Sequence, residues 1–267
     1  MARLHRLLVC LGRGGVGSQQ TAFSWGGNGD ETAPGDYDGD GKTDFSVFRR
    51  ANSTWYINNS SNGTTSQYVF GGTTYDKLAQ ADYDGDGKTD VAVFRSGTGY
   101  WYITNSSDQS FRAVQFGTSG DIPTPADFDG DGKADLAVFR PSAATFYILK
   151  SSTPGVVLSI QFGANGDVPV VGDYDGDGKA DAAVWKGNGV NQWYALLSAT
   201  GTTYATSLGA PETDIAVQND YDGDGKTDMA IWRPSNGTWY IQQSSGGVRI
   251  VQWGQNGDTP VPAFYRR

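Results

Sequence analysis

The chain contains very few of the residues on which most enzymatic and metal chemistry in proteins depends. Its 267 residues include one cysteine, Cys10, and one histidine, His5. A single cysteine excludes an internal disulfide framework, and a single histidine excludes a histidine-based metal site. A catalytic Ser-His-Asp or Cys-His set would have to use one or both of these residues, which both lie in the N-terminal segment.

Long apolar runs and basic clusters are also missing. No apolar run approaches the roughly 18 residues that cross a bilayer, and the stretch Leu7–Leu11 is shorter than the apolar region of a signal peptide. No cluster of lysine or arginine suggests a nucleic-acid partner, and no glycine-rich loop has the spacing of a phosphate cradle. We therefore expect a monomer that binds no nucleic acid and inserts into no membrane.

What the chain has is glycine, aromatic residues and one repeated acidic motif. Glycine accounts for 38 residues and aromatic residues for 13% of the chain, which is typical of an all-β protein with many tight turns. The nonapeptide D-[YF]-D-G-D-G-K-[TA]-D begins at Asp36, Asp82, Asp127, Asp173 and Asp220, with spacings of 46, 45, 46 and 47 residues. Each loop therefore belongs to one structural repeat.

The nonapeptide has the composition of a calcium loop. Carboxylates stand at positions one, three, five and nine, and glycines at positions four and six allow sharp turns. Calcium takes six to eight oxygen ligands, which a short loop can supply. The five loops hold 20 of the 29 acidic residues, and five calcium ions would change the formal charge from −9 to +1. We predict Ca²⁺ as the cofactor, about five ions in all.

The segments around each loop predict four β-strands per repeat. An apolar segment enters the loop, as at Val168–Val171, and another follows it directly, as at Val91–Arg95. A Trp-Tyr-Ile strand comes next, as at Trp101–Ile103, and a fourth segment ends in an aromatic residue and glycine, as at Phe116-Gly117. Four antiparallel strands in about 46 residues indicate a β-propeller blade. The predicted fold is a single all-β propeller domain, residues 1–267, with repeats at about 31–76, 77–121, 122–167, 168–214 and 215–258.

These motifs resemble the FG-GAP/VCBS repeat, known from integrin α-subunits. The resemblance rests on F-G and G-D-x-P followed by the acidic nonapeptide, and it extends from Trp25 to the C-terminus. It implies a propeller with Ca²⁺ in the hairpin loop between the first and second strands of each blade, in a secreted or cell-surface recognition or adhesion module. The repeat is shorter than that of integrins and carries no inserted domain, so integrin ligand recognition does not carry over.

The resemblance implies a ligand set for each loop, consisting of four aspartate side chains and one lysine carbonyl. The predicted ligands are Asp36, Asp38, Asp40, Lys42 and Asp44; Asp82, Asp84, Asp86, Lys88 and Asp90; Asp127, Asp129, Asp131, Lys133 and Asp135; Asp173, Asp175, Asp177, Lys179 and Asp181; and Asp220, Asp222, Asp224, Lys226 and Asp228. An EF-hand would need a glutamate at position twelve, where this chain has valine or isoleucine.

Outside the loops we expect no catalytic residues. Nearly every other aspartate falls in a recurrent G-D-x-P-type turn, where it is better explained as a turn former than as a catalyst: Asp30, Asp76, Asp121, Asp167, Asp214 and Asp258. A recurrent cation ends the second strand of each repeat, and it could line a ligand pocket, stack on an aromatic ring or pair with a loop aspartate. We favour the structural roles.

The sequence leaves the biological role open between three classes. We favour an extracellular or cell-surface recognition module for a glycan or an extracellular protein. A purely structural spacer is the alternative, and a glycan-active enzyme is the least favoured class.

The two ends of the chain predict how the ring closes. Residues 7–25 align with the third and fourth strands of a repeat, and Thr259–Tyr265 aligns with a first strand. Together they would form a sixth, composite blade that lacks a metal loop and a second strand and buries Cys10. The alternative is a ring of five blades with frayed ends, or a fragment of a longer array whose residues 1–18 are a worn strand or not native.

Overall fold

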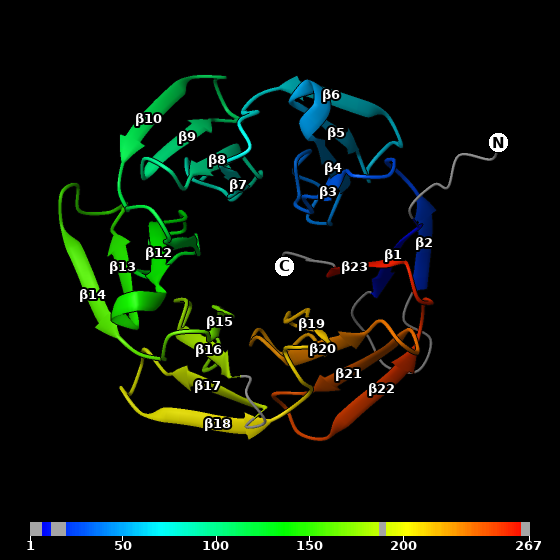
Figure 1. Ribbon diagram of the computed structural model, residues 1–267, viewed down its shortest axis with the longest axis vertical. Helices are drawn as coiled ribbons and strands as arrows, with labels where there is room; N and C mark the ends of the chain where they lie inside the picture. The colour runs from blue at the N-terminus through cyan, green and yellow to red at the C-terminus, as the bar shows by residue number, and fades with distance from the viewer. Residues whose placement is uncertain (1–6, 12–19, 187–190, 263–267) are drawn as a thin grey trace.

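The computed structural model describes residues 7–11, 20–186 and 191–262, with backbone only for residues 7–11 and 20–23. The strands form a ring of sheets around a central axis (Figure 1). Five sheets have four antiparallel strands each, and a sixth has three. The structure is therefore an all-β propeller, as the repeat predicted.

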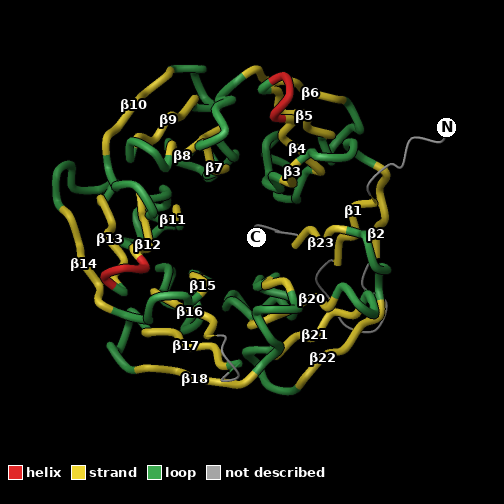
Figure 2. The backbone as a smooth tube through the Cα atoms, in the orientation of Figure 1, coloured by secondary structure: helices red, strands yellow, loops and turns green. Residues whose placement is uncertain are grey.

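In each four-stranded blade the strands follow one another from the centre of the ring outward (Figure 2). The first strands are β3 (Glu31–Thr32), β7 (Asp76–Leu78), β11 (Ile122–Pro123), β15 (Val168–Pro169) and β19 (Ile215–Ala216). The second strands are β4 (Phe45–Arg49), β8 (Val91–Arg95), β12 (Leu136–Arg140), β16 (Ala182–Lys186) and β20 (Met229–Arg233). The third strands are β5 (Thr54–Asn58), β9 (Tyr100–Thr104), β13 (Thr145–Leu149), β17 (Gln192–Leu196) and β21 (Thr238–Gln242). The fourth strands are β6 (Thr65–Val69), β10 (Phe111–Gln115), β14 (Val157–Gln161), β18 (Thr203–Ser207) and β22 (Val248–Gln252).

Helical structure is confined to two short turns. In the described part of the chain these are the 3-10 helices η1 (Arg50–Asn52) and η2 (Pro141–Ala143). Among the same residues, no helix is long and apolar enough to cross a membrane.

The core lies between the blades. Successive side chains of a strand point to opposite faces, and both faces of each second strand are covered by neighbouring blades. Phe94 of the second blade packs with Val138 of the third, whereas Val93 packs with Phe48 of the first. This explains why the second strands are apolar at successive positions. Six tryptophans are among the largest fully buried side chains, so these rings form much of the core.

The three-stranded sheet occupies the sixth position of the ring, between the first and fifth blades (Figure 1). It joins β1 (Leu7–Leu11) and β2 (Gln20–Ser24) from the N-terminal end to β23 (Thr259–Pro262) from the C-terminal end. In an antiparallel meander the first and third strands run in the same direction. When the second strand is absent, the first and third strands can pair with each other only in parallel. The pairing of β1 with β23 is indeed parallel.

The structure thus has the five four-stranded blades of the five-bladed alternative, and it places the two chain ends in a composite sheet at the sixth position. The side chain of Cys10 and residues 263–265 of the predicted first strand lie outside the described part, so their predicted places stay predictions. Val261 of β23 is buried and packs with Val47 of β4, which joins the composite sheet to the first blade.

Candidate metal centre

Each acidic loop connects the first strand of a blade to the second. In the first loop the position-one carboxylate of Asp36 accepts hydrogen bonds from the backbone N–H groups of Gly39 (2.7 Å) and Gly41 (2.9 Å). These glycines have φ values of 81° and 83°, in the left-handed region that favours glycine. The same pair of bonds recurs in the other four loops. Position one therefore fixes the turn.

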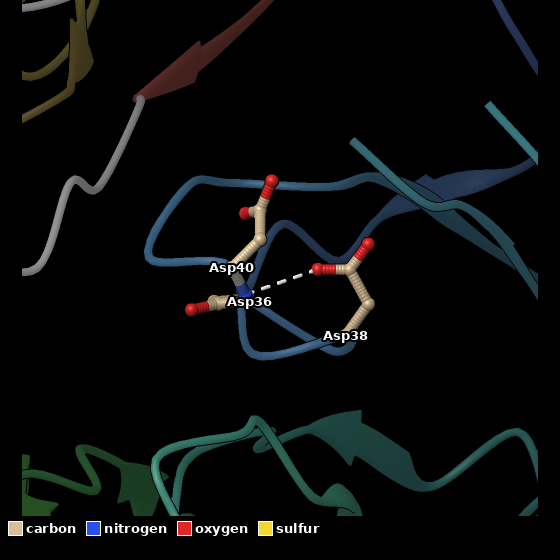
Figure 3. A group of neighbouring side chains, drawn as sticks. All are labelled: Asp36, Asp38 and Asp40. Atoms are coloured by element: carbon tan, nitrogen blue, oxygen red, sulfur yellow. Dashed lines mark hydrogen bonds between the residues drawn. The ribbon is translucent and has the colours of Figure 1, made fainter. Parts of the chain in front are cut away.

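Each loop brings three of its predicted ligands together. One oxygen from each lies within 4.8 Å of the others, with positions one, three and five gathered in the first two loops and positions one, three and nine in the rest. The gathered groups are Asp36, Asp38 and Asp40; Asp82, Asp84 and Asp86; Asp127, Asp129 and Asp135; Asp173, Asp175 and Asp181; and Asp220, Asp222 and Asp228. Figure 3 shows how Asp36, Asp38 and Asp40 project from one turn of the chain.

The remaining predicted ligands do not join these groups of three. They are the acids Asp44, Asp90, Asp131, Asp177 and Asp224. The carbonyls of Lys42, Lys88, Lys133, Lys179 and Lys226 are further predicted ligands. Their role as ligands stays a prediction.

The position-nine carboxylate is the most buried of the set. Asp44 accepts a hydrogen bond from the N–H of Tyr37 (2.7 Å) and another from the N–H of Ser60 (2.7 Å). Burial raises the pKa of Asp44 to about 6, and it does the same for Asp90 in the second loop. Loss of hydration disfavours the charged carboxylate, and a bound cation would offset that cost.

Sequence reasoning missed a pair of serines that closes four of the five loops. They stand in the hairpin between the third and fourth strands, and in the second loop Ser106 Oγ donates to Asp86 (2.9 Å) and Ser107 Oγ donates to Asp84 (2.6 Å). The sequence does contain a pattern that could have revealed them, a Ser-Ser pair whose first serine lies 16 residues after position nine of the loop. The pairs are Ser60-Ser61, Ser106-Ser107, Ser151-Ser152 and Ser244-Ser245. The fourth repeat has Ser198-Ala199, where Asp175 accepts the N–H of Ala199 (3.1 Å) and the second place of the pair carries no hydroxyl.

The donor set fits a hard cation such as calcium. It consists of carboxylate oxygens held in place by backbone N–H and serine hydroxyl donors, which leave further lone pairs on the same oxygens. In the third loop Asp129 Oδ1 is buried and has no hydrogen-bond partner among the described residues. Buried polar atoms are rarely left without a partner, so this oxygen is suited to accept a cation or a water molecule.

A cavity lies where four of the loops converge. Its volume is about 630 Å³, and its lining includes the position-one residues Asp36, Asp82, Asp127 and Asp220. These loops are therefore reached from an open space as well as from the outer surface.

The cationic side chains that end the second strands interact with other residues of the protein. Arg95 forms a two-pronged ion pair with Asp76 (2.8 and 3.2 Å), and its guanidinium lies 4.5 Å from the ring centroid of Tyr102. Arg49, Arg140 and Arg233 repeat this arrangement. Stacking on an aromatic ring was predicted, but the expected alternative of pairing with a loop aspartate is wrong for these four arginines. Their partner is the turn aspartate, because the first strand places it opposite the end of the second.

The turn aspartates also bind the backbone, as a turn former should. Asp30 accepts the N–H of Gly27 (2.7 Å), and Asp121 accepts that of Thr118 (2.8 Å). The fourth blade departs from the pattern: Lys186 lies 4.7 Å from the ring of Tyr194, and burial raises the pKa of Asp167.

Comparison with known proteins agrees with the repeat. The sequence model of the FG-GAP-like repeat matches residues 36–93, 82–138 and 127–184, which together cover more than half of the chain. No curated protein sequence matches the chain.

Solved structures share the fold at low identity. A streptogramin B lyase is 9% identical with a TM-score of 0.61, covering 98% of this chain and 88% of that one. The virginiamycin B lyase of Staphylococcus aureus is 11% identical with a TM-score of 0.54, covering 91% and 77%. A functionally unknown protein from Desulfotomaculum acetoxidans is 12% identical with a TM-score of 0.53, covering 94% and 80%. At such identities the likeness concerns the fold alone.

Proposed function

The chain belongs to the FG-GAP-like repeat family, and from this premise we propose that it is a calcium-loaded β-propeller that recognises a ligand and catalyses no reaction. The observation that carries the calcium assignment is the fivefold recurrence of a carboxylate cage with the same internal hydrogen bonds. Calcium in the loops would neutralise the crowded carboxylates and fix the loops as rigid corners. The proposed location is extracellular, where calcium is abundant enough to fill such sites.

The absence of catalysis is proposed from how the reactive side chains are used. The loop carboxylates are grouped as a set that could hold a metal ion, and the recurrent arginines are held by turn aspartates. The buried phenols of Tyr83 and Tyr174 donate to backbone carbonyls. Burial raises the pKa of both phenols, so they stay protonated. These groups act as structural supports.

Recognition is proposed because aromatic rings remain on the surface of a rigid scaffold. Phe111 is 61% exposed and Tyr75 is 65% exposed, and Tyr68 and Tyr204 are also exposed. Aromatic rings offer large apolar faces at low entropic cost, which suits binding of a glycan or of another protein's surface. We propose a glycan as the first ligand class to test.

Two measurements test the proposal. Metal analysis of protein dialysed against millimolar calcium should give about five ions per chain; no bound calcium would reduce the loops to acidic turns. A glycan array probed with and without chelator should then show calcium-dependent binding. Filled loops without glycan binding would favour the spacer role, and turnover of a glycan would favour an enzyme.

A further inference from the structure

Neighbouring acidic loops are joined directly to one another. The N–H at position eight of one loop donates to the position-one carbonyl of the preceding loop. These bonds run from Thr89 to Asp36 (2.6 Å), Ala134 to Asp82 (2.7 Å), Ala180 to Asp127 (2.6 Å) and Thr227 to Asp173 (2.6 Å). Each bond therefore links the residue that fixes one loop to the segment between two predicted ligands of the next.

A lysine side chain forms a second link at the same junctions. A Cβ built on Gly39, at position four of the first loop, would lie 3.0 Å from Lys88 Cε of the second. The same test places Gly85 against Lys133 (3.1 Å), Gly130 against Lys179 (3.2 Å) and Gly176 against Lys226 (3.1 Å). The lysine stem thus packs closely over the glycine turn of the preceding loop.

The size of the facing residues is matched across the junctions. Gly35 faces Thr89, and Gly172 faces Thr227, with a built Cβ only 2.7 Å from the threonine in both cases. At the other two junctions the corresponding pairs are Ala81 with Ala134 and Ala126 with Ala180, each pair in one core cluster. A larger residue on one side is met by a smaller one on the other, so the loops pack as a unit.

We propose that calcium binding is coupled from each loop to the next, so that the five sites form one open chain of nearest neighbours. The inference rests on the proposed calcium binding. An ion in one loop orders its position-one residue and, through the junction, the segment of the next loop that carries predicted ligands. Ordering a junction costs conformational entropy, and the first of two neighbouring ions to bind meets that cost. The second ion then binds more tightly, so the coupling is positive and reciprocal. Lys88, Lys133, Lys179 and Lys226 are positioning residues in this scheme.

The chain of sites is open because the composite sheet separates the fifth loop from the first. Residues 1–19 and 263–267 contain no aspartate or glutamate, so this sheet has no acidic loop from those segments. The first and fifth sites therefore have one neighbour each, and the three others have two.

Peptide-resolved hydrogen exchange during a calcium titration tests the coupling, since it reports a separate midpoint for each loop. The matched variants are Asp222→Asn in the fifth loop and Asp129→Asn in the third. With Asp222→Asn, the fourth loop should need about fivefold more calcium while the first is unchanged. With Asp129→Asn, both the second and the fourth loops should shift.

The outcomes separate the coupling from the calcium binding itself. Shifts confined to the altered loop would overturn the coupling and leave calcium binding intact. An equal shift in all loops, including the first for Asp222→Asn, would overturn the nearest-neighbour order. No calcium-dependent protection in the unaltered protein would overturn the proposed function and the coupling with it.

A second pair of variants removes no metal ligand. Lys226→Ala should raise the calcium midpoint of the fourth loop, whose glycine its side chain covers. Lys42→Ala is the control, because its ion pair with Asp40 is within its own loop (3.6 Å); it should shift the first loop and, through the junction, the second, and leave the fourth and fifth unchanged. A lysine acting only within its own loop would give a shift in the fifth loop for Lys226→Ala and none in the fourth, which would contradict the proposal.

Discussion

The arginine that ends each second strand shows how one side chain can hold two neighbouring segments in place. Arg95 binds the buried carboxylate of Asp76 and covers the ring of Tyr102, so the turn, the second strand and the third strand meet at one guanidinium. Burial opposes the ionised form of Asp76, but the bonds from Arg95 and Thr73 outweigh it and lower its pKa. A planar, two-pronged donor is needed for this geometry, and lysine does not supply one.

The fourth blade offers a natural test at residue scale. Lys186→Arg should rebuild the missing ion pair with Asp167 and stabilise the fold by about 1 kcal/mol, a value kept low because the other arginines are partly exposed. The melting temperature should rise by about 2–4 °C. The pKa of Asp167, now raised by burial, should fall when its carboxyl titration is followed by NMR.

The matched control is Arg140→Lys in the third blade, which should lose about as much as the fourth blade gains. Equal melting temperatures for all three proteins would show that the two-pronged pair contributes nothing to stability.

The loop serines are the second feature that acts at residue scale. Ser152 Oγ donates to Asp129 (2.6 Å), whereas Ala199 stands at the equivalent place beside Asp175. Donors to a metal-binding carboxylate typically change metal affinity by about 10-fold or more when removed. Ser152→Ala should therefore weaken calcium binding at the third loop, and Ala199→Ser should strengthen it at the fourth. Loop-resolved calcium titrations check both changes, and affinities unmoved in either variant would refute a supporting role.

The sequence predicted the acids of the site but not these serines. The aspartates recur inside a nine-residue motif, where their spacing alone indicates a cation cage. The serines belong to a hairpin that is close only in space, and their resemblance to ordinary turn residues hides their role. Similarly, the turn aspartates were recognised as turn formers, but their arginine partners lie 19 residues away in sequence.

At the scale of the strand, the repeat predicted a second strand with its observed bounds, Val91–Arg95. The second strands are apolar on both faces and end at a charged residue, so their limits are visible in the sequence. The first strands are shorter than predicted: β15 covers Val168–Pro169, and the same register resumes only at the bridge between Gly172 and Asp181. The interruption reflects the start of the loop.

The junctions between loops make a prediction at this scale. Gly35→Ala should destabilise the protein by about 1–3 kcal/mol, because the new Cβ would overlap Thr89. Adding Thr89→Ala should restore most of the loss, since the double variant reproduces the alanine pairs of the other junctions. Urea unfolding of the two single variants and the double variant checks this, with coupling expected from residues in contact. Simple additivity of the two changes would contradict the packing argument.

At the scale of the whole molecule, the repeat determined the fold class because a blade cannot bury both of its faces alone. The three-dimensional links between loops, and the partner of each end, could not be read from one repeat. They depend on how adjacent copies meet in the ring, as the pairs Gly35 with Thr89 and Val47 with Val261 show.

Removal of calcium should act on the whole ring. Each empty loop leaves carboxylates within 4.8 Å of one another, and like charges destabilise the folded state. A filled site adds about 2.7 kcal/mol at a hundredfold excess over Kd. Chelation should therefore lower the melting temperature by more than about 10 °C, given 2–4 °C per kcal/mol for a protein of this size. Asp131→Ala should cost only a fraction of that, and a melt indifferent to chelator would refute filled loops.

Ring closure depends on the N-terminal strands. In the composite sheet β1 is the central strand, paired with β2 on one side and with β23 on the other. Deleting residues 1–18 removes β1, so β2 and β23 lose their common partner and Val261 loses the sheet that holds it against Val47. Strand edges on the neighbouring blades would then be open to association with other chains. We expect a large fall in melting temperature together with aggregation, measured by calorimetry and light scattering. Deleting residues 1–6, which leaves all three strands in place, is the control. A melt unchanged by the longer deletion would mean that five blades close the ring on their own.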